Sequence, residues 1–178
     1  ELDNGAGKVP HFEEFLKRAK NDNVQVWPEY KPEDFNQAWI DDYARLIKDT
    51  GVDAVVPSFK KDELAQFKEK LPAYKQIWFQ DIIKDGIGLK ASAVPAGAYA
   101  GLINVAVKFG NNMADLNKAG IEVYAWYNEK LPDENPDGWS EVARFRPLGI
   151  ITDYPEAYKA WGDSTTYCAK PKAKCAAM

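Results

Sequence analysis

Short apolar runs alternate along the chain with longer stretches in which apolar residues recur every three or four positions. The first pattern is typical of buried parallel strands, and the second is typical of amphipathic helices. The apolar runs predict strands at 24–30, 52–57, 75–80, 86–90, 121–126 and 148–152. The helical spacing predicts helices at 11–21, 34–50, 62–70, 111–119, 140–145 and 156–161. This alternation indicates an α/β protein with a parallel sheet. The sheet is either open and doubly wound or a (β/α) barrel that lacks two of its eight units.

Composition narrows the class of protein. The 178 residues are 46% hydrophobic and 28% charged, which suits one globular domain with a substantial core. The sequence contains no apolar run near the roughly 20 residues that a membrane-spanning helix needs. The net charge of −4 argues against nucleic acid or an anionic membrane as the main partner, because phosphate groups bind basic surfaces. An anionic substrate would therefore need local positive charge or a bound cation.

The last residues differ from the rest of the chain. Residues 162–178 hold few apolar side chains and contain both cysteines, Cys168 and Cys175. We expect a disulfide between them to order this tail, which would place the protein in an extracellular or other oxidising compartment. The alternative is a pair of free thiols on a frayed terminus. Residues 1–161 are expected to form the domain. Because the chain opens with Glu1 rather than Met, we expect that an upstream segment has been removed or omitted.

Several local motifs follow one another in a distinctive order. LDNG at 2–5 leads to VPHFEEFL at 9–16, EYK at 29–31 ends the first predicted strand, and Ser58-Phe59 closes the next. AGIEVYAW at 119–126 and GIITDYP at 149–155 contain the last two predicted strands. In this order, the motifs resemble those of the glycerophosphodiester phosphodiesterase family. The resemblance implies a (β/α)8, TIM-barrel-like fold that is incomplete, with the six predicted strands as about the third to the eighth.

The resemblance also implies a site at the carboxyl ends of the strands. Glu29 would be a ligand of a divalent metal ion, Mg²⁺ or Ca²⁺, which takes oxygen ligands. Lys31 lies on the same side of the strand and would contact a phosphate oxygen. Trp126 would line the cleft for a glycerol or alcohol group. Each residue also has a plainer interpretation, as a solvated glutamate, an exposed lysine and a core tryptophan.

Other parts of the family pattern are absent from this sequence. The family's first strand ends in a His-Arg-Gly motif, and its second carries an E-x-D pair followed by a His-Asp motif. None of these is present, and the single histidine, His11, is interpreted as a helix-start residue. Ser58 and Phe59 are expected to close and pack a strand end, and Asp153 is expected to cap the last helix.

Two functions remain open. In the first, the chain is part of a metal-dependent phosphodiesterase that hydrolyses glycerophosphodiesters or lysophospholipids to a glycerol phosphate and an alcohol. A missing N-terminal segment or a second polypeptide would supply the histidines, and this chain alone would be inert. In the second, it is a truncated, non-catalytic barrel that acts as a secreted binding, storage or defence protein. A homodimer is a further way to cover the open barrel edge.

Overall fold

A single parallel sheet organises the molecule. The computed structural model describes residues 8–31, 36–81, 90–103, 115–126, 134–144 and 146–165. The five strands pair in the order β1-β2-β3-β4-β5, all parallel. Their bounds are β1 Val55–Ser58, β2 Lys75–Asp81, β3 Tyr99–Ile103, β4 Val123–Trp126 and β5 Gly149–Ile151. Val26 extends the sheet beyond β1 through an isolated parallel bridge to Ala54.

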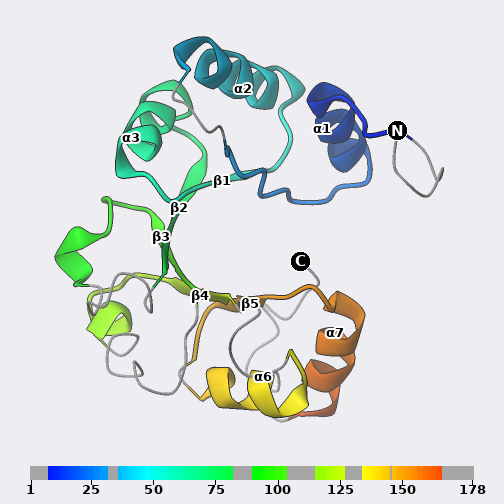
Figure 1. Ribbon diagram of the computed structural model, residues 1–178, viewed down its shortest axis with the longest axis vertical. Helices are drawn as coiled ribbons and strands as arrows, with labels where there is room; N and C mark the ends of the chain where they lie inside the picture. Colours follow the sequence, from blue (N-terminus) through cyan, green and yellow to red (C-terminus); the bar gives the residue numbers. More distant parts are fainter. Residues whose placement is uncertain are drawn as a thin grey trace.

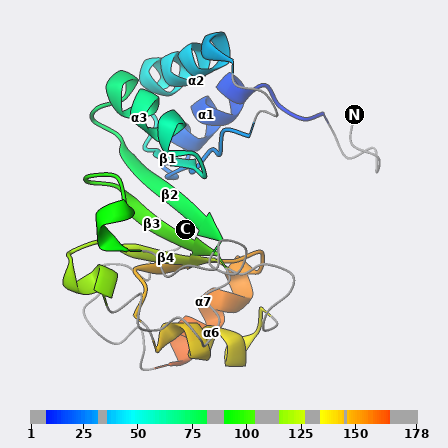
Figure 2. The same ribbon diagram turned by 60° about the vertical axis from the view of Figure 1, so that its left-hand side comes forward.

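The strand order distinguishes the two folds that the sequence left open. In a doubly wound sheet the order reverses at a switch point, and helices cover both faces. Here the order follows the sequence, so right-handed crossovers place the connecting helices on one face. Figures 1 and 2 show the helices on the outer side of a curved sheet. They are α1 Phe12–Asn21, α2 Gln37–Thr50, α3 Lys61–Lys70, the 3₁₀ turn η1 Ala91–Ala93, α6 Pro136–Ala143 and α7 Pro155–Ser164.

A contact across the inside of the curve shows how strongly the sheet closes. The rings of Trp27 and Tyr124 meet edge to face with centroids 4.7 Å apart. Trp27 follows the bridge residue Val26, and Tyr124 lies in β4, four strands away. In a flat sheet, four steps between strands would separate them by about 19 Å. The sheet is therefore most of a (β/α) barrel, and this confirms the prediction of an incomplete barrel.

The side chains form an outer and an inner core. In the outer core the sheet packs against helices, in one cluster with α1 to α3 and in a second with α6 and α7. The inner core is a smaller cluster in which strand residues face one another. Its members are Val55, Ile77 and Phe79, with Trp27, Tyr99, Tyr124 and Ile151 packed against them. A filled interior of this kind is what a barrel of eight strands allows.

The predicted helices at 11–21, 34–50 and 62–70 agree closely with the structure, and the strands agree less well. The helix predicted at 140–145 is α6, which begins four residues earlier and ends two residues earlier, and the helix predicted at 111–119 lies partly outside the described residues. The predicted left-handed helix end at Gly51 is confirmed, with φ 61°. The expected strand at 24–30 pairs through Val26 alone. Most of the expected strand at 86–90 lies outside the described residues. The strand that lies between β2 and β4 in the sheet is β3, which was not predicted from the sequence. Its Gly101 lets the Phe79 ring pack closely, because a Cβ there would lie 2.1 Å from a ring carbon.

The last helix begins differently from the prediction. Pro155 is its first residue and Tyr154 is the N-cap, so the expectation that Asp153 caps the helix is wrong by one position. The helix continues to Ser164, and both Cys168 and Cys175 lie outside the described residues. Among the described helices, none combines the length and the apolar character needed to cross a membrane.

Candidate functional site

A buried tyrosine, Tyr43, and a half-buried one, Tyr30, hold the segment that carries the E-x-K motif. The hydroxyl of Tyr43, on α2, donates a 2.6 Å hydrogen bond to the carbonyl of Pro28. Tyr30 packs edge to face against Tyr43 and Phe67, and its hydroxyl donates to the carbonyl of Asn36 at 3.3 Å. Tyr30 thus faces the helices. An extended backbone would turn its neighbours Glu29 and Lys31 to the opposite side, which is the side of Trp27.

Glu29 and Lys31 form an ion pair with each other. Lys31 Nζ lies 3.2 Å from Glu29 Oε2. The Glu29 side chain is 17% exposed and the Lys31 side chain is 67% exposed. This contact confirms that the two side chains point to the same side of the strand. The carboxylate therefore carries a neighbouring positive charge that a bound cation or an anionic substrate would compete for.

A metal ion at Glu29 would need further ligands. Mg²⁺ and Ca²⁺ are held by six or more oxygen atoms, usually from several carboxylates, carbonyls and waters. Within the described ranges, no three side chains from His, Cys, Asp and Glu come together as a possible metal site. Glu29 suits a hard cation chemically, but the described residues alone do not make up its site. Its role as a metal ligand stays a prediction.

Trp126 lies at the carboxyl end of the sheet, as predicted. It is the last residue of β4 and pairs with Ile103 of β3 on one side and Ile151 of β5 on the other. Its side chain is not among those described, so its role in lining a cleft also stays a prediction. The described structure brings Glu29 together with Lys31.

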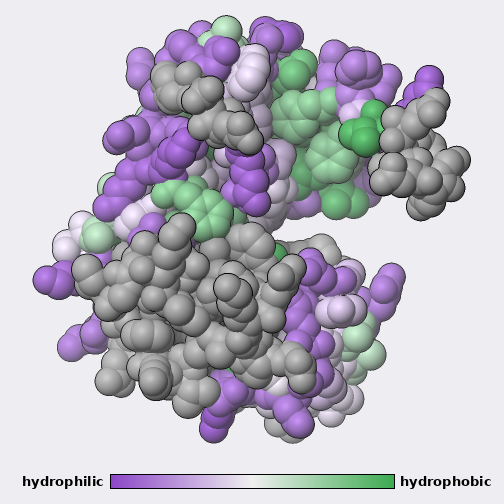
Figure 3. Space-filling model, in the orientation of Figure 1, coloured by the Kyte–Doolittle hydropathy of each residue, from purple (hydrophilic) through white to green (hydrophobic). Residues whose placement is uncertain are grey.

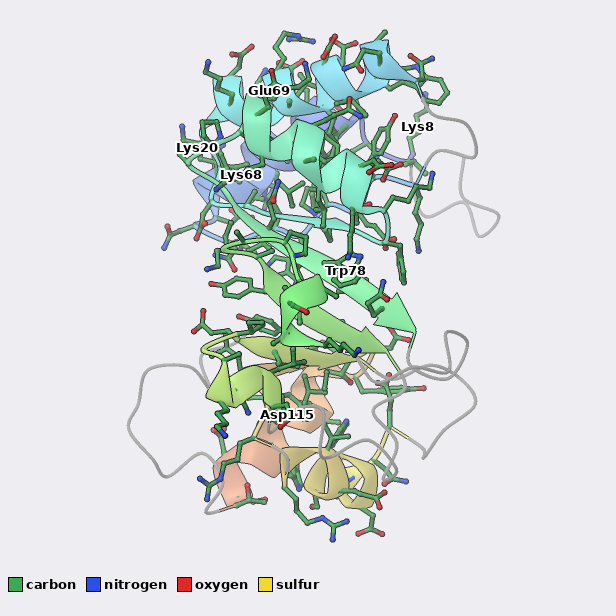
Figure 4. The ribbon with its side chains drawn as sticks, turned by 90° about the vertical axis from the view of Figure 1, so that its left-hand side faces the viewer. Lys8, Lys20, Lys68, Glu69, Trp78 and Asp115 are labelled. Carbon is green, nitrogen blue, oxygen red and sulfur yellow. The ribbon has the colours of Figure 1, made fainter. Side chains whose placement is uncertain are left out.

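Ser58 has a structural role at the end of β1. Its hydroxyl donates a 2.6 Å hydrogen bond to Glu63 Oε2 and accepts one of 2.9 Å from the Lys60 backbone N–H. The carboxylate of Glu63 is buried and also lies 3.1 Å from Lys60 Nζ. With its hydroxyl held by both of these partners, Ser58 stabilises the loop and does not act as a nucleophile. The loop is also tied to β2, because the indole of Trp78 donates to the carbonyl of Phe59 at 3.2 Å; Trp78 is labelled in Figure 4.

A carboxylate beside the loop that follows β5 was not predicted from the sequence. Glu134 accepts a 2.6 Å hydrogen bond from the hydroxyl of Thr152 and a 2.9 Å bond from the backbone N–H of Asp153. These bonds fix the loop after β5, at the carboxyl edge of the barrel. The only signal in the sequence is an acidic residue two positions before Pro136 at the start of a helix, and that signal is weak.

The aromatic lining of the barrel was missed as well. The ring of Tyr124 contacts those of Trp27 and Tyr99, with centroids 4.7 and 5.3 Å apart. Burial, with smaller contributions from Tyr99 and Glu122, raises the pKa of Tyr124 to about 12. At neutral pH the Tyr124 side chain is therefore uncharged. Lys75 covers the Tyr99 ring at 4.3 Å from the nitrogen to the ring centroid.

Comparisons with known proteins give a clear answer for the fold. No protein family profile matches the sequence, and no curated protein matches it. Among solved structures, a protein of Galdieria sulphuraria assigned as a glycerophosphodiester phosphodiesterase is similar, with a TM-score of 0.72 and 15% identity, over 90% of this chain. The fold is that of a glycerophosphodiester phosphodiesterase barrel. The motif resemblance is thus confirmed at the level of the fold.

Two further structures of such barrels agree. One is a protein of Silicibacter pomeroyi DSS-3 assigned as a glycerophosphoryl diester phosphodiesterase, with a TM-score of 0.70 and 17% identity over 86% of this chain. The other is the glycerophosphodiester phosphodiesterase of Agrobacterium tumefaciens str. C58, with a TM-score of 0.61 and 18% identity over 85%. This chain spans only 66%, 56% and 62% of the three matched chains, respectively.

Proposed function

We propose that this chain forms most of the barrel of a phosphodiesterase of the glycerophosphodiester class. The completed protein would hydrolyse a phosphodiester bond in a glycerophosphodiester or a lysophospholipid and release a glycerol phosphate and an alcohol. The observation that supports this proposal is the ion pair of Glu29 and Lys31, which follows the bridge residue Val26 in a barrel with this fold. Active sites of (β/α) barrels lie at the carboxyl ends of the strands, where this pair follows Val26.

Each of the three candidate side chains would have its own role, which follows from its charge and shape. Lys31 would place an ammonium group on a phosphate oxygen, which an anionic substrate needs in a chain whose net charge is −4. The aromatic ring of Trp126 would face the glycerol or alcohol group. A divalent cation at Glu29, completed by ligands that lie outside the described residues, would polarise the phosphodiester bond.

A second candidate function is binding without catalysis. The observation that favours it is the shortage of groups for acid–base chemistry: the one histidine, His11, is exposed at the N-cap of α1. Its backbone N–H donates to Glu14 Oε2 at 3.1 Å, which is a helix-start arrangement. In this alternative, the barrel would bind a phosphodiester and release it unchanged.

Hydrolysis of glycerophosphocholine in the presence of Mg²⁺ or Ca²⁺ tests the proposal. In the completed barrel we expect Lys31→Met and Glu29→Gln to lower kcat/KM by about 10- to 1,000-fold, because each removes a charge that acts on the phosphodiester. The matched control is Lys17→Met, since Lys17 forms a similarly exposed ion pair with Glu13 at 2.6 Å on α1. Full activity in both site variants would contradict the proposal. Hydrolysis by the 178-residue chain alone would contradict the expectation that this chain is inert by itself. Binding of glycerophosphocholine without turnover would favour the second candidate.

A further inference from the structure

Exposed hydrophobic side chains gather at one face of the barrel. The helices of a (β/α) barrel run antiparallel to its strands, so each helix begins at the face where the strands end. Among the described residues, six large hydrophobic side chains are exposed, and five of them lie within three residues of the first residue of a helix. These five are Val9, Phe15, Trp39, Phe59 and Tyr154. The sixth, Val24, follows the end of α1 at the opposite face. Apolar side chains gathered in this way indicate a surface for interaction.

The aromatic members beyond α1 are spread around this face. Trp39 lies in the first turn of α2 and is 55% exposed. Phe59 lies between β1 and α3, and Tyr154, which is 58% exposed, is the N-cap of α7 after β5. Because β1 and β5 are the first and last strands of the sheet, the three rings are not confined to one groove. Figures 1 and 3 look onto this face, and Figure 3 shows hydrophobic side chains at its surface. An extended, deformable surface suits such separated rings.

Two lysines stand beside Phe59 where the helix itself disfavours them. Lys60 is the N-cap of α3 and its side chain makes no capping hydrogen bond, and Lys61 is the first residue of the helix. N-caps favour Ser, Thr, Asp or Asn, and the helix dipole disfavours a cation at this end. Both lysines are exposed, and Lys61 Nζ lies 4.1 Å from the centroid of the Trp78 ring. A local preference broken in this way is typical of a functional surface.

The charges of this face are mixed. Exposed carboxylates also lie at the helix starts, among them Asp62 of α3 and Glu156 of α7. A phosphocholine headgroup complements both signs, because its phosphate attracts lysines and its quaternary ammonium attracts carboxylates and aromatic ring faces. An anionic surface would be repelled by the carboxylates and by the net charge of −4. Trp and Tyr side chains also concentrate where lipid meets water.

We propose that this face docks on a zwitterionic, phosphocholine-bearing lipid surface. Trp39, Phe59 and Tyr154 enter the interface, and Lys60 and Lys61 contact lipid phosphates. The inference rests on the proposed function and deepens it, because it selects lysophospholipids, which aggregate in water, over water-soluble glycerophosphodiesters. The strands end at the same face, so a docked lipid would reach the candidate site directly.

Binding of the complete protein to vesicles of dioleoylphosphatidylcholine tests this without catalysis. We expect the double variant Trp39→Gln, Tyr154→Ser to lower the partition coefficient, measured by co-sedimentation, by about tenfold. Serine is a favoured N-cap, so Tyr154→Ser should not weaken α7. The control is Val24→Gln, which removes an exposed apolar side chain from the opposite face and should leave binding unchanged. Failure of the unchanged protein to bind, or equal binding by the double variant, would overturn the proposal.

A charge reversal tests the lysines separately. We expect Lys61→Glu to weaken vesicle binding by about threefold. Lys68→Glu is the matched control, because Figure 4 shows Lys68 at the opposite end of the same helix. Equal binding by these two variants would contradict the assigned phosphate contact. Stronger binding to phosphatidylglycerol vesicles than to phosphatidylcholine vesicles would overturn the choice of a zwitterionic surface.

Kinetics separate the docking face from the proposed function. In the complete protein, hydrolysis of lysophosphatidylcholine should rise where this lipid begins to form micelles. The double variant should lose that rise and hydrolyse glycerophosphocholine at an unchanged rate. Equal losses on both substrates would contradict docking as the role of the two rings. Absence of hydrolysis on both substrates by the unchanged protein would contradict the proposed function, whereas vesicle binding decides the docking face by itself.

Discussion

The hydroxyl of Tyr43 donates a 2.6 Å hydrogen bond to the carbonyl of Pro28, the residue before Glu29. A side chain of α2 thereby holds the backbone that presents the candidate site. Burial raises the pKa of the Tyr43 hydroxyl, so it remains a hydrogen-bond donor well into the alkaline range. The packing of Tyr30 against Tyr43 and Phe67 holds the same segment against the helices.

Removing the Tyr43 hydroxyl should destabilise the protein. Tyr43→Phe leaves a partly buried carbonyl without its donor, and we expect the free energy of unfolding to fall by about 1–3 kcal/mol. Tyr74→Phe is the matched control, because its hydroxyl makes a longer, 3.3 Å bond to the carbonyl of Ile47 at a partly buried position. Urea denaturation of both variants measures the difference. Equal losses of unfolding free energy in the two variants would show that the bond to Pro28 stabilises the protein no more than the bond to Ile47.

The ion pair of Lys31 with Glu29 should contribute little to stability. Lys31 is 67% exposed, and exposed ion pairs are worth about 0–1 kcal/mol. We therefore expect Lys31→Met to change the free energy of unfolding by less than about 1 kcal/mol in urea denaturation. Such a result would assign any loss of phosphodiesterase activity in this variant to the substrate contact. A loss of several kcal/mol would instead give Lys31 a structural role.

Gly101 should tolerate no side chain. A Cβ there would lie 2.1 and 2.5 Å from two carbons of the Phe79 ring, so Gly101→Ala must displace the ring or the strand. We expect a loss of about 1–3 kcal/mol, measured by thermal or urea denaturation. In a Phe79→Ala background the same change should cost much less, because the obstructing ring is gone. Additive losses in the double variant would contradict this account of the contact.

Tyr124 should make the protein sensitive to alkaline pH. Its pKa is raised to about 12 in the folded state, mainly by burial, whereas an unfolded tyrosine titrates near pH 10. The stability linked to this shift is fully present below pH 10 and is lost as the pH rises through about 12. Tyr124→Phe should therefore show a shallower fall of the free energy of unfolding between pH 10 and 12 than the unchanged protein. Identical pH profiles of the two proteins would mean that the pKa of Tyr124 is not shifted in the folded state.

Local chemistry explains which features the sequence predicted well. The end of α2 follows from Gly51, whose left-handed backbone conformation favours glycine. The shared side of Glu29 and Lys31 follows from the two-residue period of an extended chain. The site's predicted parts are therefore those that depend on neighbours in the sequence.

The missed features depend on contacts between distant segments. β3 was missed because Ala100 and Gly101 carry little apolar surface, and only the Phe79 ring on the next strand explains a glycine there. The role of Glu134 depends on its hydrogen bonds to Thr152 and Asp153, which lie 18 and 19 residues away in the sequence. The contact of Trp27 with Tyr124 requires the sheet to curve through four strands. Such curvature leaves no local pattern in the sequence.

The most direct test of the central claim, that these strands belong to a barrel, is a nuclear Overhauser measurement between the Trp27 and Tyr124 rings. Selective isotope labelling of tryptophan and tyrosine would isolate the signal, and Tyr124→Phe with unlabelled phenylalanine would confirm its assignment. We predict a clear cross-peak, as expected for ring centroids 4.7 Å apart. Absence of that cross-peak, with contacts between neighbouring strands intact, would show an open sheet and contradict the barrel.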